Sequence, residues 1–246
     1  MKTYLHAFAM CQSMFCAIPC PWKLWDEEAR DKMLLFLPIV GLEMGAIWAG
    51  LAWICRELRL PALISGLVLA AYPYLVTGFL HLDGFMDVTD AVKSCRSLER
   101  RREILKDSHV GSFAVIDVVL LVLAQFAFFA SAKAEADVRI LIFLPAVSRC
   151  CSSLAVTGLK PMSTSQYAGQ EKPKSHLVIL LAMLCAFTAA GFILCGKAGF
   201  TLVGCMAGYA LALRKGYRSL SGMNGDISGY ALTIGELCGV AVYALF

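Results

Sequence analysis

The chain has 246 residues, of which 59% are hydrophobic and 16% are charged, and its formal net charge at pH 7 is +4. Soluble domains are nearer to half apolar and a quarter charged, so this composition argues against a single soluble core and favours a membrane protein. No polar stretch is long enough to fold separately, and we therefore expect residues 1–246 to form one membrane-embedded domain.

The first twenty residues predict a short helix. The segment from Tyr4 to Pro19 is apolar and follows Lys2, as in a signal peptide, but it lacks a clean cleavage site of small residues. Pro19 and Pro21 end the apolar run early. We therefore expect a retained short or interfacial helix at the N-terminus.

Seven later segments predict membrane-spanning helices, because a span needs about 20 mostly apolar residues. The sixth segment is short, and Gly196 and Lys197 before it predict a tight hairpin. Gly41 and Gly45 in the first segment form a GxxxG pattern, which is typical of close helix packing. The predicted fold class is an all-α, polytopic membrane bundle. Its predicted spans are 33–55, 60–80, 111–132, 138–159, 176–195, 198–213 and 228–246.

The distribution of basic residues predicts how the chain crosses the membrane. The segments 20–32, 81–110, 160–175 and 214–227 carry 15 of the 22 Lys and Arg residues, and the alternate loops carry 5. Basic loops stay on the cytoplasmic side. We therefore expect a multi-pass protein of the cell (inner) membrane with these longer segments in the cytoplasm. Their charge is explained by topology and anionic lipid, so we expect no nucleic-acid partner.

The sharpest motif follows the second predicted span and reads His81-x-Asp83-Gly84-x-x-Asp87-x-x-Asp90. In a helix the three aspartates share one face, where their charges repel one another. A divalent cation would remove the repulsion, and Mg²⁺ prefers carboxylates together with water and substrate phosphates. A solvated acidic helix start is the plainer alternative, but it accounts for Asp83 alone. We predict that Asp83 and Asp87 bind Mg²⁺ and that Asp90 acts as a general base or a further ligand.

Three other sets of residues are candidates for the same site. His81 is a catalytic candidate, although a single histidine at a span end more often makes interfacial hydrogen bonds. The turn containing Gly222, Gly225 and Asp226 could approach a phosphate through backbone N–H groups, or Asp226 could simply cap the next helix. We predict that Asp226 completes the metal site. Arg96 is the best phosphate ligand in a basic stretch that otherwise anchors the topology.

Ionisable residues also lie within the predicted spans, at Glu43, Asp117, Arg149 and Glu236. Such residues usually face the bundle interior or a cavity. The sequence leaves open whether Arg149 pairs with Asp117 or with Glu236. Most of the 11 cysteines lie in apolar runs and no CxxC pair occurs, so zinc and disulfide frameworks are disfavoured.

These motifs, in this order, resemble the cobalamin synthase family over most of the chain. The resemblance implies a Mg²⁺-dependent transferase that joins adenosylcobinamide-GDP to α-ribazole, or to its 5′-phosphate, and releases GMP. It also implies substrate contacts from Asp107, Ser108, Gly222 and Gly225. The matching segments are Ile18-Pro19-x-Pro21, Pro38-x-x-Gly41, the His81 motif, Arg101 to Gly111, Gly222-x-x-Gly225-Asp226-x-x-Gly229, and Glu236.

Two other functions remain open at this point. A CDP-alcohol phosphotransferase also spaces aspartates at helical intervals, but its motif is longer and contains an Ala-Arg pair that is missing here. A transporter would use the intramembrane charges as a pathway, but we see no duplicated halves of the kind that transporters often have. A homo-oligomer is also left open.

Overall fold

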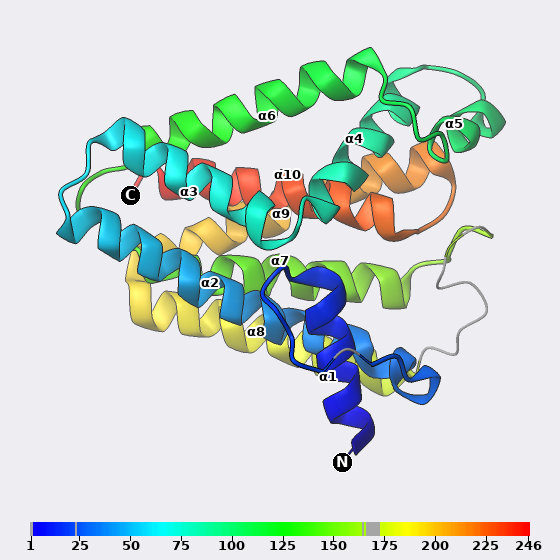
Figure 1. Ribbon diagram of the computed structural model, residues 1–246, viewed down its shortest axis with the longest axis horizontal. Helices are drawn as coiled ribbons and strands as arrows, with labels where there is room; N and C mark the ends of the chain where they lie inside the picture. The colour runs from blue at the N-terminus through cyan, green and yellow to red at the C-terminus, as the bar shows by residue number, and fades with distance from the viewer. Residues whose placement is uncertain (1, 23, 164, 166–172) are drawn as a thin grey trace.

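The computed structural model describes residues 2–22, 24–163, 165 and 173–246, and this part of the chain is helical (Figure 1). It contains no β-strand, and its one isolated bridge joins Pro161 to Met223. The predicted all-α class is therefore confirmed. The α-helices are α1 (Lys2–Phe15), α2 (Met33–Glu57), α3 (Ala62–Val76), α4 (Leu80–Lys93), α5 (Leu98–Ile104), α6 (Ser112–Ser131), α7 (Ile140–Gly158), α8 (Lys174–Cys195), α9 (Phe200–Leu220) and α10 (Gly225–Tyr243), with 3-10 turns η1 (Glu27–Lys32) and η2 (Gly196–Gly199).

Helix α1 confirms the expected short N-terminal helix, and it runs across α2 (Figure 1). Its buried side chains include Ala7, Met10 and Phe15, which belong to one apolar cluster with Met33 and Leu37 of α2. The His6 ring also contacts the Asp26 carboxylate before η1 at 2.6 Å. The N-terminal segment is therefore a packed part of the bundle.

Four described segments are long and apolar enough to cross a membrane, or five if α3 and α4 together form one broken span. They are Glu27–Glu57, Ser112–Ser131, Ile140–Gly158 and Lys174–Leu220. The last contains both α8 and α9, between which the chain turns back at η2 (Figure 1). Gly196 has a φ of 56° there, which agrees with the predicted hairpin. Each of the seven predicted spans thus overlaps a helix, although α9 runs to Leu220 and so extends beyond its predicted end at residue 213.

Helix α7 lies in the interior, with 78% of its span buried. It approaches α2 closely at Gly41 and Gly45, where an added Cβ would meet the carbonyl oxygens of Pro145 and Ile142. Small residues allow membrane helices to approach this closely. The predicted GxxxG surface therefore packs α2 against α7.

The second predicted span ends earlier than expected. Helix α3 stops at Val76, and after three residues the chain enters α4 at an angle of 87° to α3. Gly78 and Phe79 take left-handed conformations at the bend, with φ angles of 57° and 64°. With 14 residues α4 is too short to span a bilayer alone, so we place it at the membrane border. There it packs against α10 and α6 (Figure 1).

Candidate active site

Two glycines bring the start of α4 against the start of α10. A Cβ on Gly84 would lie 3.0 Å from both the Cα and the carbonyl oxygen of Asp226. A Cβ on Gly229 would lie 3.2 Å from the carbonyl oxygen of His81. Because neither glycine carries a side chain, the acidic motif and the C-terminal turn meet, although they are more than 130 residues apart in sequence.

The carboxylates of Asp83, Asp87 and Asp226 lie close enough at this contact for their charges to interact, and we call these three residues the acidic cluster. Asp83 is exposed, whereas Asp87 and Asp226 are half-buried. Removal of the Asp87 carboxylate from water raises its pKa to about 7, and the charges of Asp83, Asp226 and Asp90 add to the effect. The site therefore concentrates negative charge that a cation would stabilise.

The donor set fits Mg²⁺ shared with a phosphorylated substrate. Among the residues that the structure describes, no three His, Cys, Asp or Glu side chains form a group that would hold a metal ion unaided. Mg²⁺ does not need such a cage, because it typically binds one or two carboxylates and completes its shell with water and phosphate oxygens. Asp83 and Asp87, one turn apart on α4, supply such carboxylates.

Asp90 makes two hydrogen bonds that the sequence did not predict. One of its carboxylate oxygens accepts from the backbone N–H of Gly111 at 2.5 Å, and the other accepts from that of Ala114 at 3.0 Å. These are donors at the first turn of α6, where an acidic side chain is favourable. The structure thus assigns Asp90 to capping α6, and the predicted role as general base has no support from the geometry.

Asn224 is the cap of α10, and this leaves Asp226 facing α4. The Asn224 side-chain oxygen accepts from the Ile227 backbone N–H at 3.0 Å, and its amide nitrogen donates to Asp226 Oδ2 at 2.6 Å. The alternative in which Asp226 caps the helix is therefore wrong. Gly222 is buried against Met162, whose Cγ would lie 2.6 Å from an added Cβ, so close packing requires a glycine there, and its predicted substrate contact stays a prediction.

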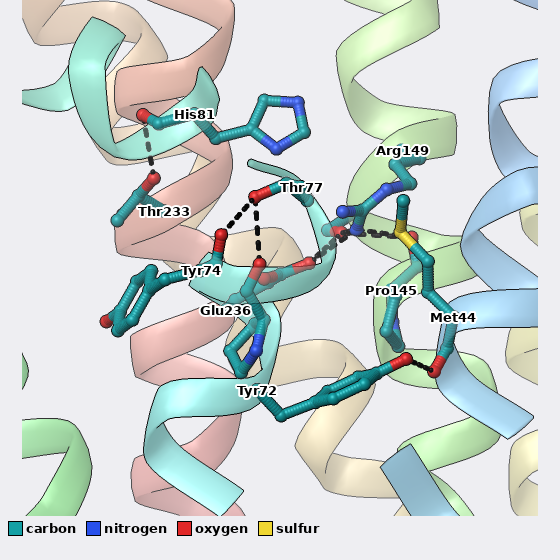
Figure 2. Close-up of polar contacts among 11 residues, drawn as sticks. Met44, Tyr72, Tyr74, Thr77, His81, Pro145, Arg149, Thr233 and Glu236 are labelled. Carbon is teal, nitrogen blue, oxygen red and sulfur yellow. Dashed lines mark hydrogen bonds and ion pairs between the residues drawn. The ribbon is translucent and has the colours of Figure 1, made fainter. Parts of the chain in front are cut away.

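His81 places a neutral ring beside this cluster. Its ring is nearly parallel to that of Phe15, with centroids 6.4 Å apart, and its carbonyl oxygen accepts from Thr233 Oγ1 at 3.2 Å (Figure 2). Burial, together with the charge of Arg149, lowers the pKa of His81 to about 3. Such a group is a poor proton acceptor at neutral pH, so His81 is better suited to hydrogen bonding than to base catalysis. Its buried Nδ1 has no partner among the described residues.

The residues between α4 and α6 that were predicted to contact substrate lie in exposed segments. Arg96 lies between α4 and α5, and Asp107 and Ser108 lie in the turn before α6. Asp107 Oδ1 accepts from the backbone N–H of His109 at 3.0 Å. Within the described part of the chain, no hydrogen bond or ion pair joins these three residues to the acidic cluster, so their predicted substrate roles stay predictions.

Two neighbouring arginines tie α5 to the end of α9. Arg101 donates to the carbonyl oxygen of Ser219 at 3.2 Å, and Arg102 Nε donates to that of Leu220 at 3.0 Å. Both cations therefore stabilise the helix end just before the C-terminal turn, as positive charge does at helix C-termini. No pattern in the sequence indicates this pairing, because the partners are backbone carbonyls over 100 residues away.

A cavity of about 360 Å³ adjoins the cluster. Asp226 and His81 line it. Gly225 also lines it and is exposed, so a substrate in the cavity could reach Gly225, as its predicted substrate contact requires. Its other polar lining residues include Ser152, Asn224 and Ser228, and its apolar ones include Phe15, Leu34, Leu37 and Val156.

Deeper in the bundle, Arg149 of α7 pairs with Glu236 of α10 (Figure 2). Their closest atoms, Arg149 Nη1 and Glu236 Oε1, are 2.7 Å apart, and Ser148 Oγ donates to the same oxygen at 2.7 Å. Of the two partners left open for Arg149, Glu236 is therefore the one observed. Asp117 instead pairs with Lys93 at 2.7 Å, a contact between α6 and α4 that was not predicted.

Comparisons with known proteins show what the whole chain is similar to. A family model described as cobalamin-5-phosphate synthase matches residues 7–244. The chain is 35% identical to the adenosylcobinamide-GDP ribazoletransferase of Clostridium perfringens (strain ATCC 13124), with 100% of each chain covered. It is 32% identical to that of Clostridium botulinum (strain Alaska E43), also with 100% of each covered, and 30% identical to that of Lachnoclostridium phytofermentans, covering 97% of this chain and 94% of the relative. No solved structure matches.

Proposed function

This chain belongs to the cobalamin-5-phosphate synthase family, and from that premise we infer that it joins adenosylcobinamide-GDP to α-ribazole, or to α-ribazole 5′-phosphate, and releases GMP. The reaction belongs to the assembly of the nucleotide loop of cobalamin. The observation that carries the local assignment is the close contact of Gly84 with Asp226, because it joins two acidic segments from opposite halves of the chain. A diphosphate substrate needs such a site.

We propose that Asp83 and Asp87 hold Mg²⁺ together with phosphate oxygens of the donor substrate. When bound, the ion neutralises charge on the diphosphate and on the departing GMP. Phosphoryl transfer requires little covalent work from the protein, so positioning and charge stabilisation carry the catalysis. Asp83 and Asp87 share one face of α4, which orients both carboxylates from a single rigid element.

Asp226 is our candidate for the proton acceptor. A ribose hydroxyl of the acceptor attacks the cobinamide-side phosphorus, the bond from that phosphorus to the bridging oxygen breaks, and GMP leaves with the electron pair. The hydroxyl proton passes to a carboxylate. Asp226 belongs to the acidic cluster and also lines the cavity, whereas the Asp90 carboxylate accepts hydrogen bonds from the start of α6. We therefore propose that Asp226 accepts the proton, in place of the metal-ligand role predicted from the sequence.

We propose that the protein lies in the inner membrane and that its site faces the cytoplasm. Basic segments lie at the same end of the bundle as α4 and the turn between α9 and α10, and this supports the orientation (Figure 1). Side chains such as Val119 and Leu120 of α6 and Val178 of α8 are exposed and would contact lipid. We propose that the whole chain acts as one membrane-embedded domain.

The direct test is incubation of the purified protein with adenosylcobinamide-GDP, α-ribazole and Mg²⁺, followed by quantification of GMP and of the corrinoid product. We expect the two products in equal amounts, and no GMP when α-ribazole is left out. Failure to form GMP with both substrates present would overturn the proposal. Release of CMP from a CDP-alcohol would instead support the phosphotransferase alternative.

A further inference from the structure

The cavity beside the acidic cluster has two chemically different walls. Phe15 of α1, Leu34 and Leu37 of α2 and Val156 of α7 contribute apolar side chains. Asn224, Asp226 and Ser228, at the start of α10, contribute polar ones. Ser152 belongs with the polar wall, because its hydroxyl lies 2.5 Å from that of Ser228. A ligand that fits this lining therefore combines an apolar part with a part rich in hydrogen-bonding groups, such as a ribose.

The size of the cavity narrows the choice of ligand. Its volume of about 360 Å³ is at the lower end of the range for small-molecule sites. A nucleoside fits such a space, whereas a corrinoid is several times larger and does not. The cavity therefore suits either the acceptor riboside or the guanosine end of the donor.

The apolar wall decides between these two nucleosides. Guanine carries several hydrogen-bonding groups along its edge, and burying them without partners is costly. Phe15, Leu34, Leu37 and Val156 have no polar side-chain atom to offer. The base of the acceptor α-ribazole is dimethylbenzimidazole, which has almost no such demand, and its flat ring suits the neighbouring parallel rings of Phe15 and His81.

We infer that this cavity binds the acceptor, α-ribazole, with its base against the apolar wall and its ribose toward Asn224 and Asp226. The inference rests on the function proposed above. It places the attacking ribose hydroxyl beside Asp226, which takes up the proton as the new oxygen–phosphorus bond forms and GMP departs. The donor's diphosphate then lies on the side of Asp83 and Asp87, and its corrinoid stays outside the cavity.

The test is Val156→Phe, which fills the apolar end without touching the acidic cluster. Steady-state kinetics of GMP release should show the KM for α-ribazole raised by roughly tenfold or more, since steric fit in an apolar pocket discriminates by such factors. The KM for adenosylcobinamide-GDP should stay unchanged. The riboside of unsubstituted benzimidazole, which lacks two methyl groups, should suffer less than α-ribazole. The matched control is Val178→Phe on the exposed face of α8, where no change is expected.

A second variant covers the case in which Val156→Phe fails to fold. Leu34→Ala removes side-chain volume from the same wall and so enlarges the cavity. It should shift the preference toward a riboside with a base bulkier than that of α-ribazole, measured as the ratio of the kcat/KM values for that riboside and for α-ribazole. An unchanged base preference in Leu34→Ala, or an effect of Val156→Phe on the KM for the corrinoid instead of α-ribazole, overturns the inference. If the wild-type protein itself releases no GMP, the proposed function fails first, so the two failures are distinguishable.

Discussion

Asp87 is held half-buried among like charges, and its neutral replacement separates stability from catalysis. Asp87→Asn keeps the shape but removes the charge. At pH 8 without Mg²⁺ we expect a higher midpoint of thermal unfolding, because a charged carboxylate is no longer kept half out of water and its repulsion from Asp83 and Asp226 is relieved. GMP release with Mg²⁺ should fall roughly 100-fold, equivalent to about 3 kcal/mol, because a metal ligand is lost.

A result of the opposite kind would remove Asp87 from the metal site. If Asp87→Asn released GMP at nearly the wild-type rate and with the same dependence on Mg²⁺ concentration, the carboxylate would have no role in catalysis. The comparison needs equal amounts of folded protein in the membrane fraction for both variants.

Asp90 lies one turn further along α4 and is expected to behave differently. Asp90→Ala removes both acceptors from the first turn of α6, so unfolding should become easier by about 1–2 kcal/mol. The activity of the folded fraction should fall much less than in Asp87→Asn. Thermal unfolding and initial rates on the same preparation check this, and a large loss of kcat at unchanged stability would restore Asp90 as the base.

At the scale of elements, the crossing of α4 and α10 depends on a missing side chain. Gly84→Ala would place a methyl group 3.0 Å from the Asp226 backbone, so the two helices must separate by a few tenths of an ångström. Because small displacements of reacting groups are costly, we expect GMP release to fall by up to about 10²-fold while the protein stays inserted. The control is Gly50→Ala on α2, where nothing lies within 4 Å of the new methyl group. Equal activity of the two variants would contradict the importance of this contact.

The buried pair of Arg149 and Glu236 joins α7 to α10 beneath the site. Glu236→Ala leaves an unpaired buried guanidinium, and breaking such a pair typically costs about 3–5 kcal/mol. We expect a strong loss of thermal stability, measured on detergent-solubilised protein. The double variant Arg149→Met with Glu236→Leu should recover much of it, because no charge is then left alone. If the double variant kept stability but lost activity, the pair would serve the substrate as well as the fold.

The elements that could be predicted from the sequence are those built from long apolar runs, because hydrophobicity alone predicts a span. The bend between α3 and α4 could not, since the left-handed conformations of Gly78 and Phe79 depend on packing around the turn. The same holds within the site. Spacing and topology predicted that Asp83, Asp87 and Asp226 lie close together, as they do. The capping roles of Asp90 and Asn224 were not, because aspartate and asparagine are equally good caps and metal-site residues.

At the scale of the molecule, all reactive parts gather at one end of the bundle. Figure 1 shows α4, α5 and the turn between α9 and α10 together, with the C-terminus and the α2–α3 turn at the opposite end. The substrates and GMP are polar and phosphorylated, so they reach this end from water. The basic residues of the adjoining segments predict that this end of the bundle lies on the cytoplasmic side of the membrane.

Cys95 offers a test of this orientation, because it is exposed in the segment between α4 and α5. A membrane-impermeant thiol reagent should leave Cys95 unlabelled in intact cells and label it in inside-out vesicles. Cys20 lies on the same predicted side and is only partly buried, so the test uses a Cys20→Ser background, in which Cys95→Ser should abolish the vesicle signal. Ala134→Cys, exposed in the segment between α6 and α7, should show the reverse pattern when it is added to the variant that lacks Cys20 and Cys95. Labelling of Cys95 from outside intact cells would place the acidic cluster on the wrong side of the membrane. The substrates would then have to cross the bilayer before reaction, and the orientation inferred from the basic segments would be rejected.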